Sequence, residues 1–480
     1  MLELFLNSSF LGWAYTTIMI LYGLTTLGII LVVVSENRNP LKSLAWVTVL
    51  LLLPVVGIIL YIFFGRSIKN TRMISRRNRR KLKNRQKLPN VDTRSLKLSY
   101  ASRQQIALGR SLTGAHYFPG NKVDIYTDGQ SKFEDLIKDL RQATRYINLQ
   151  YYIFDDDATG QLIRDILIDR ARAGVTVRVV YDHVGSFSTR TRFFKDMRRE
   201  GILAYPFFKV TFPQLGTRIN WRNHRKIVII DGHTGYIGGM NIADRYITGG
   251  KFPSWRDTHL RISGPAVAGL QFSFAIDWNF MGQPLIEETV DITPPADGNV
   301  GIQIITAGPT SQWRNIALAF HKAIATATRR VYIQTPYFLP TEALLKALQT
   351  AALAHVDVRL MIPRKSDSQM LTLASASYIE ECLKAGIKIY FYEAGMLHSK
   401  MIIIDDEIST VGSTNFDFRS FEHNFEANAF LFSTELNSRL TEVFNNDLRH
   451  STRVLPAEWR RRRWYRKLAE SAVRLLSPIL

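Results

Sequence analysis

The stretch HRKIVIIDGHTGYIGGMN, at residues 224–241, has a second copy in HSKMIIIDDEISTVGSTN, at residues 398–415. A His, a Lys, an Asp, a Gly and an Asn stand at the same offsets in both copies. One copy of so short a pattern could arise by chance, but two copies in the same register indicate an internal repeat. The sequence therefore predicts two related halves that meet to build one site.

Each copy begins with a His and a Lys two positions apart, ahead of an apolar run that is typical of a strand. Because residues i and i+2 of a strand point the same way, His224 and Lys226 would share one face. Asp231 follows Lys226 by an odd step, so it would leave from the other face or lie in the turn. We expect one cleft that holds both His and both Lys, with the two Asp in supporting roles. The second copy repeats this spacing with His398, Lys400 and Asp405.

These residue types suit an anionic phosphodiester. An unperturbed His titrates at about pH 6.5, so one neutral imidazole can attack phosphorus. The other imidazole, once protonated, can donate its proton to the departing oxygen. The two Lys, with Asn241 and Asn415, supply charge and hydrogen bonds to the phosphoryl oxygens. Since the Lys provide the positive charge, we expect no metal ion and no other cofactor; the sequence also lacks the usual ligand spacing of a metal site.

The doubled pattern resembles the signature of the phospholipase D superfamily, in which two such motifs form one active site and a phospho-histidine intermediate. Members also carry an acid after the Asn, which orients the opposing His. Glu426 matches that position, and Asp257 is the best match in the first half, at a longer spacing from Asn241. Gly239 stands where many members have Ser, so a hydroxyl contact would be absent there. The implied catalytic residues are His224, Lys226, Asp231, His398, Lys400 and Asp405, and the implied phosphate-binding residues are Gly239, Asn241, Ser413 and Asn415.

Two stretches near the N-terminus, residues 4–35 and 43–65, contain no charged side chain. Each is long enough to cross a hydrocarbon core of about 30 Å, which takes about 20 helical residues. We expect a two-helix transmembrane hairpin within residues 1–65, with helices at about residues 10–34 and 44–64. Pro54 and Gly57 are expected to kink the second helix. The alternatives are a cleaved signal peptide and a buried core helix, but no basic segment precedes the first stretch.

The charge of the 480-residue chain is strongly positive, at +21, and much of it follows the apolar stretches. Residues 66–87 hold eleven Lys or Arg and no acid, within an expected basic linker at residues 66–100. Basic segments beside a span stay in the cytoplasm, which predicts a multi-pass protein whose catalytic part faces the cytoplasm. Such a segment also attracts an anionic membrane surface. The lone Cys382 excludes an internal disulfide and agrees with that compartment.

The tail, residues 451–480, mixes indoles, cations and apolar residues at helical spacing. This pattern fits an amphipathic helix that lies on the membrane surface. It fits equally well a helix that packs against the catalytic core. The sequence leaves these two interpretations open.

The intervening residues are predicted to fold as two α/β halves, at residues 101–293 and 299–450. In each half an apolar strand pattern, at residues 145–154 or 330–338, lies between two helical patterns and precedes a further strand. Alternating helices and strands favour α/β/α layers with largely parallel sheets, and the halves would pack side by side. The hinge is expected at residues 294–298. The first half is longer near residues 186–223, which form either a lipid entrance or a surface loop.

A second resemblance is narrower and extends over nearly the full length. The chain resembles the bacterial cardiolipin synthases, which implies transfer of a phosphatidyl group between two phosphatidylglycerol molecules, giving cardiolipin and glycerol. It also implies that His224 is the nucleophile, that His398 is the general acid and then the base, and that the protein resides in the bacterial cell membrane. An oligomer is compatible with the sequence. The resemblance lies in Asn39-Pro40, Leu44-Ala-Trp46, Leu53-Pro54-Val-Val-Gly57, Tyr61-Ile-Phe-Phe-Gly65, Leu112-Thr-Gly114, Tyr126-Thr-Asp-Gly129, Asn220-Trp-Arg-Asn-His224 and the closing Leu-Leu-Ser-Pro478-Ile-Leu.

Without the resemblance, the residues indicate only a membrane-anchored phosphodiesterase or phosphatidyltransferase. Hydrolysis and transfer differ in whether water or a lipid alcohol reaches the intermediate, which depends on how well the cleft excludes water. A phospholipase D-type hydrolase is therefore the first alternative. A nuclease of the same superfamily would explain the positive charge but not the apolar stretches, so we expect no nucleic acid partner. A membrane scaffold without activity is the third alternative.

Overall fold

The computed structural model describes residues 2–35, 40–53, 55–65, 71–86, 88, 91–92, 94–210 and 220–477. The chain divides into two compact units. Residues 1–68 and 210–220 form the first unit, and residues 69–209 and 221–480 form the second. Four parts of the chain that bear on these predictions lie outside the described residues. They are residues 36–39 between the two apolar stretches, the expected kink at Pro54, residues 211–219 of the expected lipid entrance or surface loop, and the closing residues 478–480.

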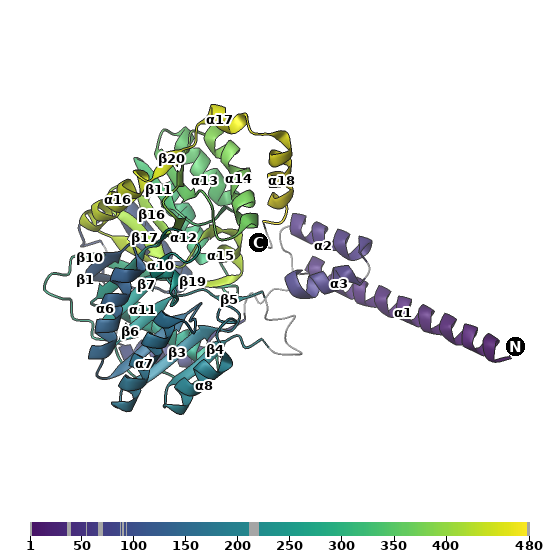
Figure 1. Ribbon diagram of the computed structural model, residues 1–480, viewed down its shortest axis with the longest axis horizontal. Coiled ribbons are helices and arrows are strands. Elements are labelled where there is room, and N and C mark those ends of the chain that lie inside the picture. Colours follow the sequence, from purple (N-terminus) through teal and green to yellow (C-terminus); the bar gives the residue numbers. More distant parts are fainter. Residues whose placement is uncertain are drawn as a thin grey trace. The chain divides into compact units, whose positions relative to one another are not determined.

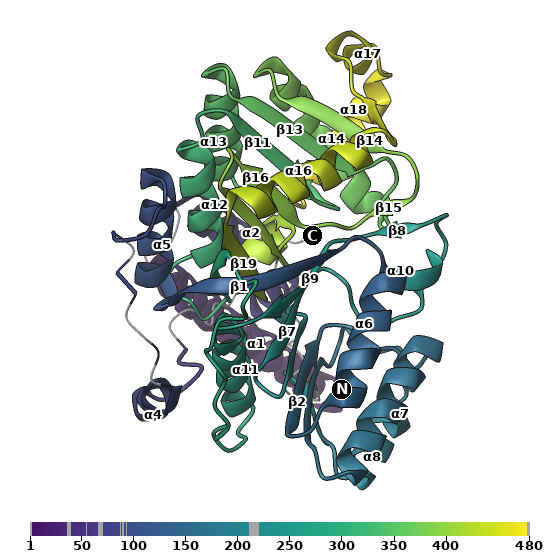
Figure 2. The same cartoon turned by 90° about the vertical axis from the view of Figure 1, so that its left-hand side faces the viewer.

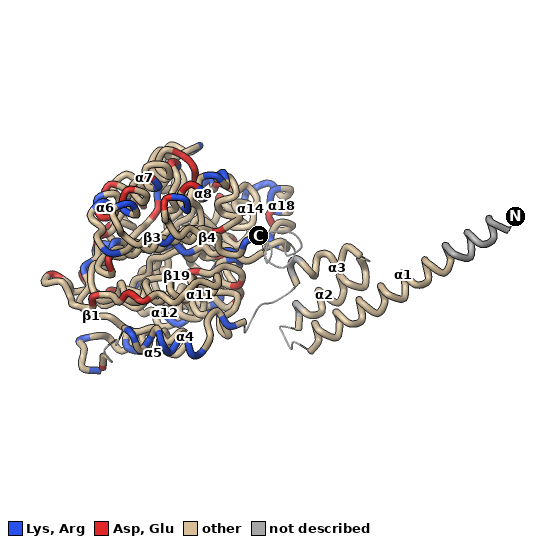
Figure 3. The backbone as a smooth tube through the Cα atoms, turned by 90° about the horizontal axis from the view of Figure 1, so that it is seen from below, with Lys and Arg blue, Asp and Glu red and all other residues tan. Residues whose placement is uncertain are grey.

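The first unit begins with the long helix α1 (Leu2–Ser35), whose segment Gly12–Ser35 is long and apolar enough to cross a membrane. Figure 1 shows α1 as one extended helix, and Figure 3 shows no charged residue in the part of α1 that is not drawn in grey. The next elements are α2 (Pro40–Leu52), α3 (Val56–Leu60) and the single π-helical turn η1 (Tyr61–Gly65). Among the described residues, Gly12–Ser35 is the one candidate span.

The expected second span, residues 44–64, is not one continuous helix. The helix α2 has 13 residues, which at 1.5 Å per residue cover about 20 Å, less than a hydrocarbon core of about 30 Å. The rings of Trp46 and Tyr61 lie edge to face, with centroids 5.4 Å apart, whereas a straight helix would separate them by about 22 Å. The chain therefore folds back after α2, and Val55 adopts a positive φ of 64° at this point. The two-helix hairpin is not supported in the expected form.

The second unit is built on one sheet of sixteen strands within its described residues. The first half contributes β1 (Tyr117–Tyr126), β2 (Tyr146–Tyr151), β3 (Thr176–Asp182), β4 (Leu203–Phe207), β5 (Arg222–Asn223), β6 (Ile227–Ile230), β7 (Thr234–Gly238) and β9 (His259–Ser263). The second half contributes β10 (Val300–Ala307), β11 (Arg330–Gln334), β13 (Asp357–Pro363), β14 (Lys388–Tyr392), β16 (Met401–Ile404), β17 (Ile408–Gly412), β19 (Asn424–Phe432) and β20 (Ser451–Arg453). The order is β20-β14-β13-β11-β16-β17-β19-β10-β1-β9-β7-β6-β2-β3-β4, and β5 pairs with β19.

The prediction of largely parallel sheets is wrong. Only β2-β3-β4 and β11-β13-β14 pair in parallel along the main sheet order, while the strands between and beside them pair antiparallel. The repeated motif itself is one reason, because its two strands, β6-β7 and β16-β17, are joined by short turns and must run antiparallel. The pairing of β1 with β10, and of β10 with β19, also joins the two halves into one continuous sheet.

Helices cover both faces of the sheet in each half (Figure 2). In the first half, α6 (Gly129–Gln142), α7 (Ala158–Arg172) and α8 (Thr191–Arg199) lie opposite α11 (Val267–Phe280). The second half has four helices at the corresponding positions in the chain: α12 (Asn315–Ala325), α13 (Glu342–Leu353), α14 (Gln369–Lys384) and α16 (Thr434–Leu448). Each half has its own apolar core, so the internal repeat of the sequence is a repeat of structure.

Two basic segments flank this framework in the second unit. The helix α4 (Arg76–Gln86) lies in the expected linker and is followed by α5 (Tyr100–Thr113); Figure 3 shows the basic residues of α4. In the tail, α17 (Pro456–Arg460) leads to α18 (Trp464–Arg474), which packs on α14. Arg474 pairs with Glu381 at 2.6 Å across this contact. Trp464 remains 74% exposed, so α18 has both a packed face and an open aromatic face.

Candidate active site

Each of the two motif His residues directly follows a short strand, and that strand pairs with a strand of the other half. The strand β5 pairs in parallel with the start of β19, and β15 (Met396–Leu397) pairs in parallel with β8 (Trp255–Arg256). The backbone N–H of His224 then donates to the carbonyl of Phe425 at 2.9 Å, and that of His398 donates to the carbonyl of Arg256 at 2.7 Å. The two exchanges are equivalent, so the site has an approximate twofold arrangement.

Each His is held by an acid from the opposite half. Nδ1 of His224 lies 3.0 Å from Oε1 of Glu426, and Nδ1 of His398 lies 2.6 Å from Oδ2 of Asp257. Both acids are fully buried. A carboxylate at Nδ1 stabilises the tautomer with its proton on that nitrogen, which leaves Nε2 with a free lone pair.

The charges of the site maintain this tautomer at neutral pH. Burial lowers the pKa of the His224 imidazole to about 4, against the opposing effect of Glu426, and the nearby Lys226 and Lys400 lower it further. Burial and Lys400 also lower the pKa of His398. Burial raises the pKa of Glu426, but His224 and Lys226 more than offset this and hold it below its usual value. A neutral imidazole beside an ionised carboxylate is the expected state of the empty site.

Both imidazoles line a single pocket of about 690 Å³. Asn241 and Asn415 line it too, so the two motif copies contribute a His and an Asn each. Oδ1 of Asn415 is buried and makes no hydrogen bond to the described residues, whereas Asn241 donates to the hydroxyl of Tyr246 at 2.6 Å. The pocket therefore offers two ring nitrogens and an unused amide oxygen to a ligand.

The two lysines lie beneath the pocket rather than in its wall. Lys226 donates to the carbonyl of His224 at 2.7 Å, and Lys400 donates to the carbonyl of His398. Burial lowers the pKa of Lys226 to about 7 and that of Lys400 to about 8, partly offset by the two acids. Neither ammonium group lines the pocket in this conformation, so the expected direct contact of the lysines with a phosphoryl group stays a prediction.

The small residues between the motif Gly and Asn differ in what they contact. The hydroxyl of Ser413 donates to Oε2 of Glu426. A Cβ atom at Gly239 would lie 2.0 Å from Oδ1 of Asp257, so the first half has no room for a side chain at this position. Asp257 uses that oxygen to accept the backbone N–H of Thr258 at 2.7 Å instead. The two acids are thus fixed in different ways, and the two halves are not chemically identical.

Asp231 and Asp405 do not line the pocket, although the resemblance implied a catalytic role. Asp231 adopts a positive φ of 53° in the β6-β7 turn and accepts hydrogen bonds from the backbone N–H groups of residues 144–146. Asp405 repeats this contact with residues 328–330. Each carboxylate ties the motif turn to the start of the neighbouring strand, so we infer a structural role for both.

Asp231→Asn should therefore reduce stability more than catalysis. The amide can replace one carboxylate oxygen but not both, and a hydrogen bond to a charged group is worth about 1.5–3 kcal/mol. We expect the free energy of unfolding to fall by about 2–3 kcal/mol, with activity per folded molecule nearly unchanged. Thermal unfolding and active-site titration would measure the two effects, with Asp165→Asn on the surface of α7 as the control. An unaltered stability with activity lost would contradict the structural role.

The sequence did not single out several residues that line the pocket. The Tyr152 ring meets His224 edge on at 4.9 Å, and the Trp255 ring lies 5.5 Å from His398. The basic side chains of the pocket wall come from the short strand β5, from a loop and from short helices, with no repeat signal: Arg222, Lys251, Arg245 and Arg419. Within the ranges that the structure describes, no group of three or more His, Cys, Asp or Glu is placed to hold a metal ion.

Comparison with known proteins gives the family. The model described as "Cardiolipin synthase, PLD-like domain" matches residues 136–251 and 320–448, and "Phospholipase_D-nuclease N-terminal" matches residues 23–66. The chain belongs to the PLD-like cardiolipin synthase family. Both motif copies fall within the matched ranges.

Relatives in this family match over nearly the whole chain. The major cardiolipin synthase ClsA of Bacillus subtilis is 40% identical over 94% of this chain and 96% of its own length. The cardiolipin synthase of Halalkalibacterium halodurans is 38% identical over 99% of this chain and 97% of its own. The crystal structure of phosphatidylserine synthase from Haemophilus influenzae covers 78% of this chain and all of that one, with a TM-score of 0.60 at 12% identity, which shows a shared fold.

Proposed function

We propose that this protein is a cardiolipin synthase, which transfers a phosphatidyl group from one phosphatidylglycerol to another and releases glycerol. The observation that carries the proposal is the pair of imidazoles in one pocket, each hydrogen bonded to an acid of the opposite half. The names of the full-length relatives agree with it, since each is called a cardiolipin synthase. This family membership narrows a general phosphodiester chemistry to transfer between lipids.

The first step forms a phosphatidyl-histidine. Nε2 of His224 attacks the phosphorus of the first phosphatidylglycerol, while Glu426 holds the Nδ1 proton and stabilises the charge that develops on the ring. The bond from phosphorus to the glycerol oxygen breaks. His398 donates its Nε2 proton to that oxygen, and glycerol leaves. An anionic phosphate in the pocket favours the protonated form of His398 that this step requires.

The second step reverses the first. A glycerol hydroxyl of the second phosphatidylglycerol gives its proton to Nε2 of His398, and its oxygen attacks the phosphorus. The bond between phosphorus and His224 breaks, which yields cardiolipin and the free enzyme. The charged lysines and the basic wall of the pocket stabilise the negative charge on the phosphoryl oxygens in both steps.

Membrane association follows from the family and from α1, and we propose the finer topology. The eleven Lys or Arg at residues 66–87 favour a cytoplasmic location for the second unit. A second crossing by residues 44–64 would require α2 and α3 to rearrange into one helix, so we propose one crossing, by Gly12–Ser35. The open aromatic face of α18 supports contact with an anionic membrane surface.

Analysis of the lipid products tests the proposed function. Purified full-length protein in phosphatidylglycerol micelles should give cardiolipin and glycerol in equal amounts, measured by mass spectrometry. Phosphatidic acid as the main product would instead assign a phospholipase D-type hydrolase, in which water reaches the intermediate. Cleavage of DNA without any lipid turnover would assign a nuclease.

The pH dependence of kcat/KM reports the pKa values of the ionisable groups in the free enzyme. We expect the two lysines to determine the decrease of kcat/KM at alkaline pH. Each Lys is charged below its pKa and loses its charge as the pH rises. We therefore expect kcat/KM to fall as the pH rises through about 7 and 8, the pKa values of Lys226 and Lys400. Lys226→Met should lower kcat/KM at neutral pH. In this variant kcat/KM should fall only through the pKa of Lys400. A wild-type profile that stays flat across this range would contradict the role of the lysines.

Chelation tests the proposal that the lysines replace a metal ion. Dialysis against EDTA should leave the turnover rate unchanged, because the positive charge of the site comes from side chains. Metal content would be measured in the same samples. A loss of activity that Mg²⁺ or Zn²⁺ restores would overturn this part of the mechanism.

A further inference from the structure

A second and larger cavity lies in the same unit, behind the catalytic pocket. Its volume is about 1190 Å³, and it shares no lining residue with the pocket that holds the imidazoles. Arg225 and Phe425 line it, whereas the preceding residues His224 and Asn424 line the catalytic pocket. Successive side chains of a strand point to opposite faces, so the two spaces lie on opposite sides of the β5-β19 pair.

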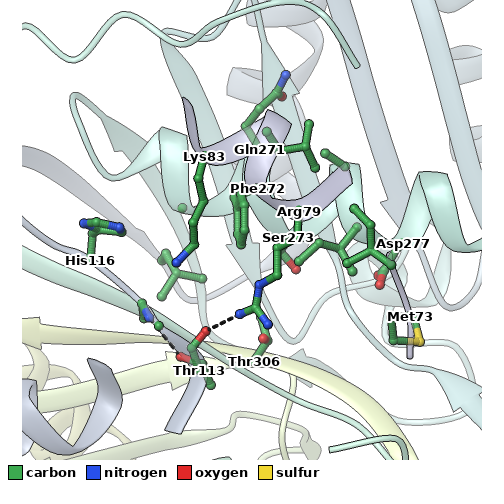
Figure 4. Close-up of a pocket in the computed structure, with 18 of the residues that line it drawn as sticks. Met73, Arg79, Lys83, Thr113, His116, Gln271, Phe272, Ser273, Asp277 and Thr306 are labelled. Carbon is green, nitrogen blue, oxygen red and sulfur yellow. Dashed lines mark hydrogen bonds between the residues drawn. The ribbon is translucent and has the colours of Figure 1, made fainter. Parts of the chain in front are cut away.

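One end of this cavity gathers positive charge that no acid of the described residues pairs with. A Cβ atom at Gly114 would lie 3.4 Å from Nζ of Lys83 and 3.7 Å from a guanidinium nitrogen of Arg79, so both cations converge on this turn. Arg79 donates to the carbonyl of Thr113 at 2.9 Å. Figure 4 shows Lys83 and Arg79 reaching from α4 toward Thr113. Within the described chain, Lys83 makes no hydrogen bond or ion pair.

His116 adds a third nitrogen to this end. Its Nδ1 atom is buried and has no hydrogen bond partner among the described residues. Burial lowers the pKa of His116, and Lys83 and Arg110 lower it further. Burial and Arg79 likewise lower the pKa of Lys83, and no acid opposes this effect. Lys83 and Arg79 thus lie close together, and neither forms an ion pair with an acid of the described residues.

The acids of the cavity are already paired and do not serve as a counter-ion for these cations. Both carboxylate oxygens of Asp277 accept a hydrogen bond from Arg225 at 2.6 Å, and the amides of Gln150 and Asn223 also donate to Asp277. Glu288 accepts a hydrogen bond from Arg178 at 2.7 Å. Arg225 also donates to the carbonyls of Ala307 and Glu426, each at 3.1 Å. The free positive potential therefore remains at the end formed by α4 and Gly114.

The rest of the cavity is largely apolar. Phe272 and Ile276 stand one turn apart on α11 and form part of its wall, both only partly buried. Further apolar side chains come from α4, α5, β1, β10 and the loop before α12: Leu82, Leu112, Phe118, Ile304 and Trp313. Ligand pockets usually measure about 300–1,000 Å³, so this volume far exceeds what an inorganic phosphate would fill.

We propose that this cavity is a binding site for an anionic phospholipid, separate from the catalytic pocket. Lys83, Arg79 and His116 hold the phosphate, and the acyl chains lie along Phe272 and Ile276. Arg and Lys form charge-assisted hydrogen bonds with phosphate oxygens, which are about twice as strong as those between neutral groups. This site goes beyond the proposed function and does not depend on which lipid reaction the enzyme catalyses.

Photochemical labelling of the full-length protein tests the site directly. The protein would be placed in phosphatidylcholine nanodiscs that contain a phosphatidic acid with a diazirine in one acyl chain. We expect a label on the α11 peptide that holds Phe272 and Ile276, located by mass spectrometry. A phosphatidylcholine with the same diazirine should label this peptide about tenfold less, since it lacks net charge. Absence of the α11 label, or equal labelling by both lipids, would overturn the proposal.

Charge reversal on α4 tests where the lipid headgroup binds. The double variant Arg79→Glu and Lys83→Glu should reduce the α11 label by about tenfold or more, while labels near Trp255 in the catalytic pocket persist. The matched control is Arg80→Glu with Lys81→Glu, because these exposed residues of the same helix do not line the cavity. Equal labelling in the two double variants would contradict the headgroup position. Displacement of the label by an equal concentration of inorganic phosphate would assign the site to free anions instead.

Discussion

His224→Ala is expected to abolish the covalent phosphatidyl-enzyme and to lower the turnover of phosphatidylglycerol by about 10⁴-fold. The reason is geometric. His224 offers Nε2 to the shared pocket, and its other nitrogen is bound to the buried Glu426 at 3.0 Å. Alanine leaves no nucleophile at that position, and the remaining donors can only polarise the lipid.

The measurement is mass spectrometry of the intact protein after rapid quenching with acyl-labelled phosphatidylglycerol. Wild type should carry one phosphatidyl group, mapped to His224, and the variant none. His233→Ala is the matched control, because this exposed His belongs to the same motif copy but does not line the pocket. A phosphatidyl group found on His398 in the wild-type protein would reverse the roles of the two imidazoles.

His398→Ala should produce a different defect, because this residue is proposed to move protons rather than to bind phosphorus. Turnover of phosphatidylglycerol should fall by about 10²–10⁴-fold, the usual contribution of general acid–base catalysis. A phosphatidyl ester of p-nitrophenol needs no protonation of its leaving group. With this donor the variant should release one nitrophenolate per site and then stop as the phosphatidyl-enzyme.

A rapid burst of nitrophenolate is therefore the discriminating signal. We expect a burst without turnover in His398→Ala and no burst in His224→Ala. His450→Ala serves as the control in the second half, since this exposed residue lies outside the pocket. The opposite pattern of bursts would assign the nucleophile to His398, and equal steady turnover in both variants would refute the covalent route.

The sequence was informative where the chemistry depends on local spacing. A His and a Lys two positions apart, an apolar strand and a turn at Asp are short-range features, and they form the β6-β7 and β16-β17 hairpins. The family resemblance drawn from them is confirmed by the matched family model. The acids Glu426 and Asp257 lie against the opposing imidazoles because the short strands β5 and β15 cross between the halves.

The sequence was uninformative where contacts join distant residues. The pairing of β1 with β10 leaves no periodic signal, so the antiparallel centre of the sheet was missed. Pro54 and Gly57 led us to expect a kink in the second apolar stretch, but no local pattern indicated that the chain folds back to bring Tyr61 against Trp46. The burial of Lys226 and the uncompensated Lys83 both depend on the packed structure around them, which composition does not reveal.

A complex with vanadate tests the central claim most directly, because vanadate adopts the five-coordinate geometry of phosphoryl transfer. The account predicts a single vanadium atom in the pocket, bonded to Nε2 of His224, with the opposite apical oxygen hydrogen bonded to Nε2 of His398. Two vanadium sites, one at each imidazole, or a vanadium atom bound away from both, would contradict it.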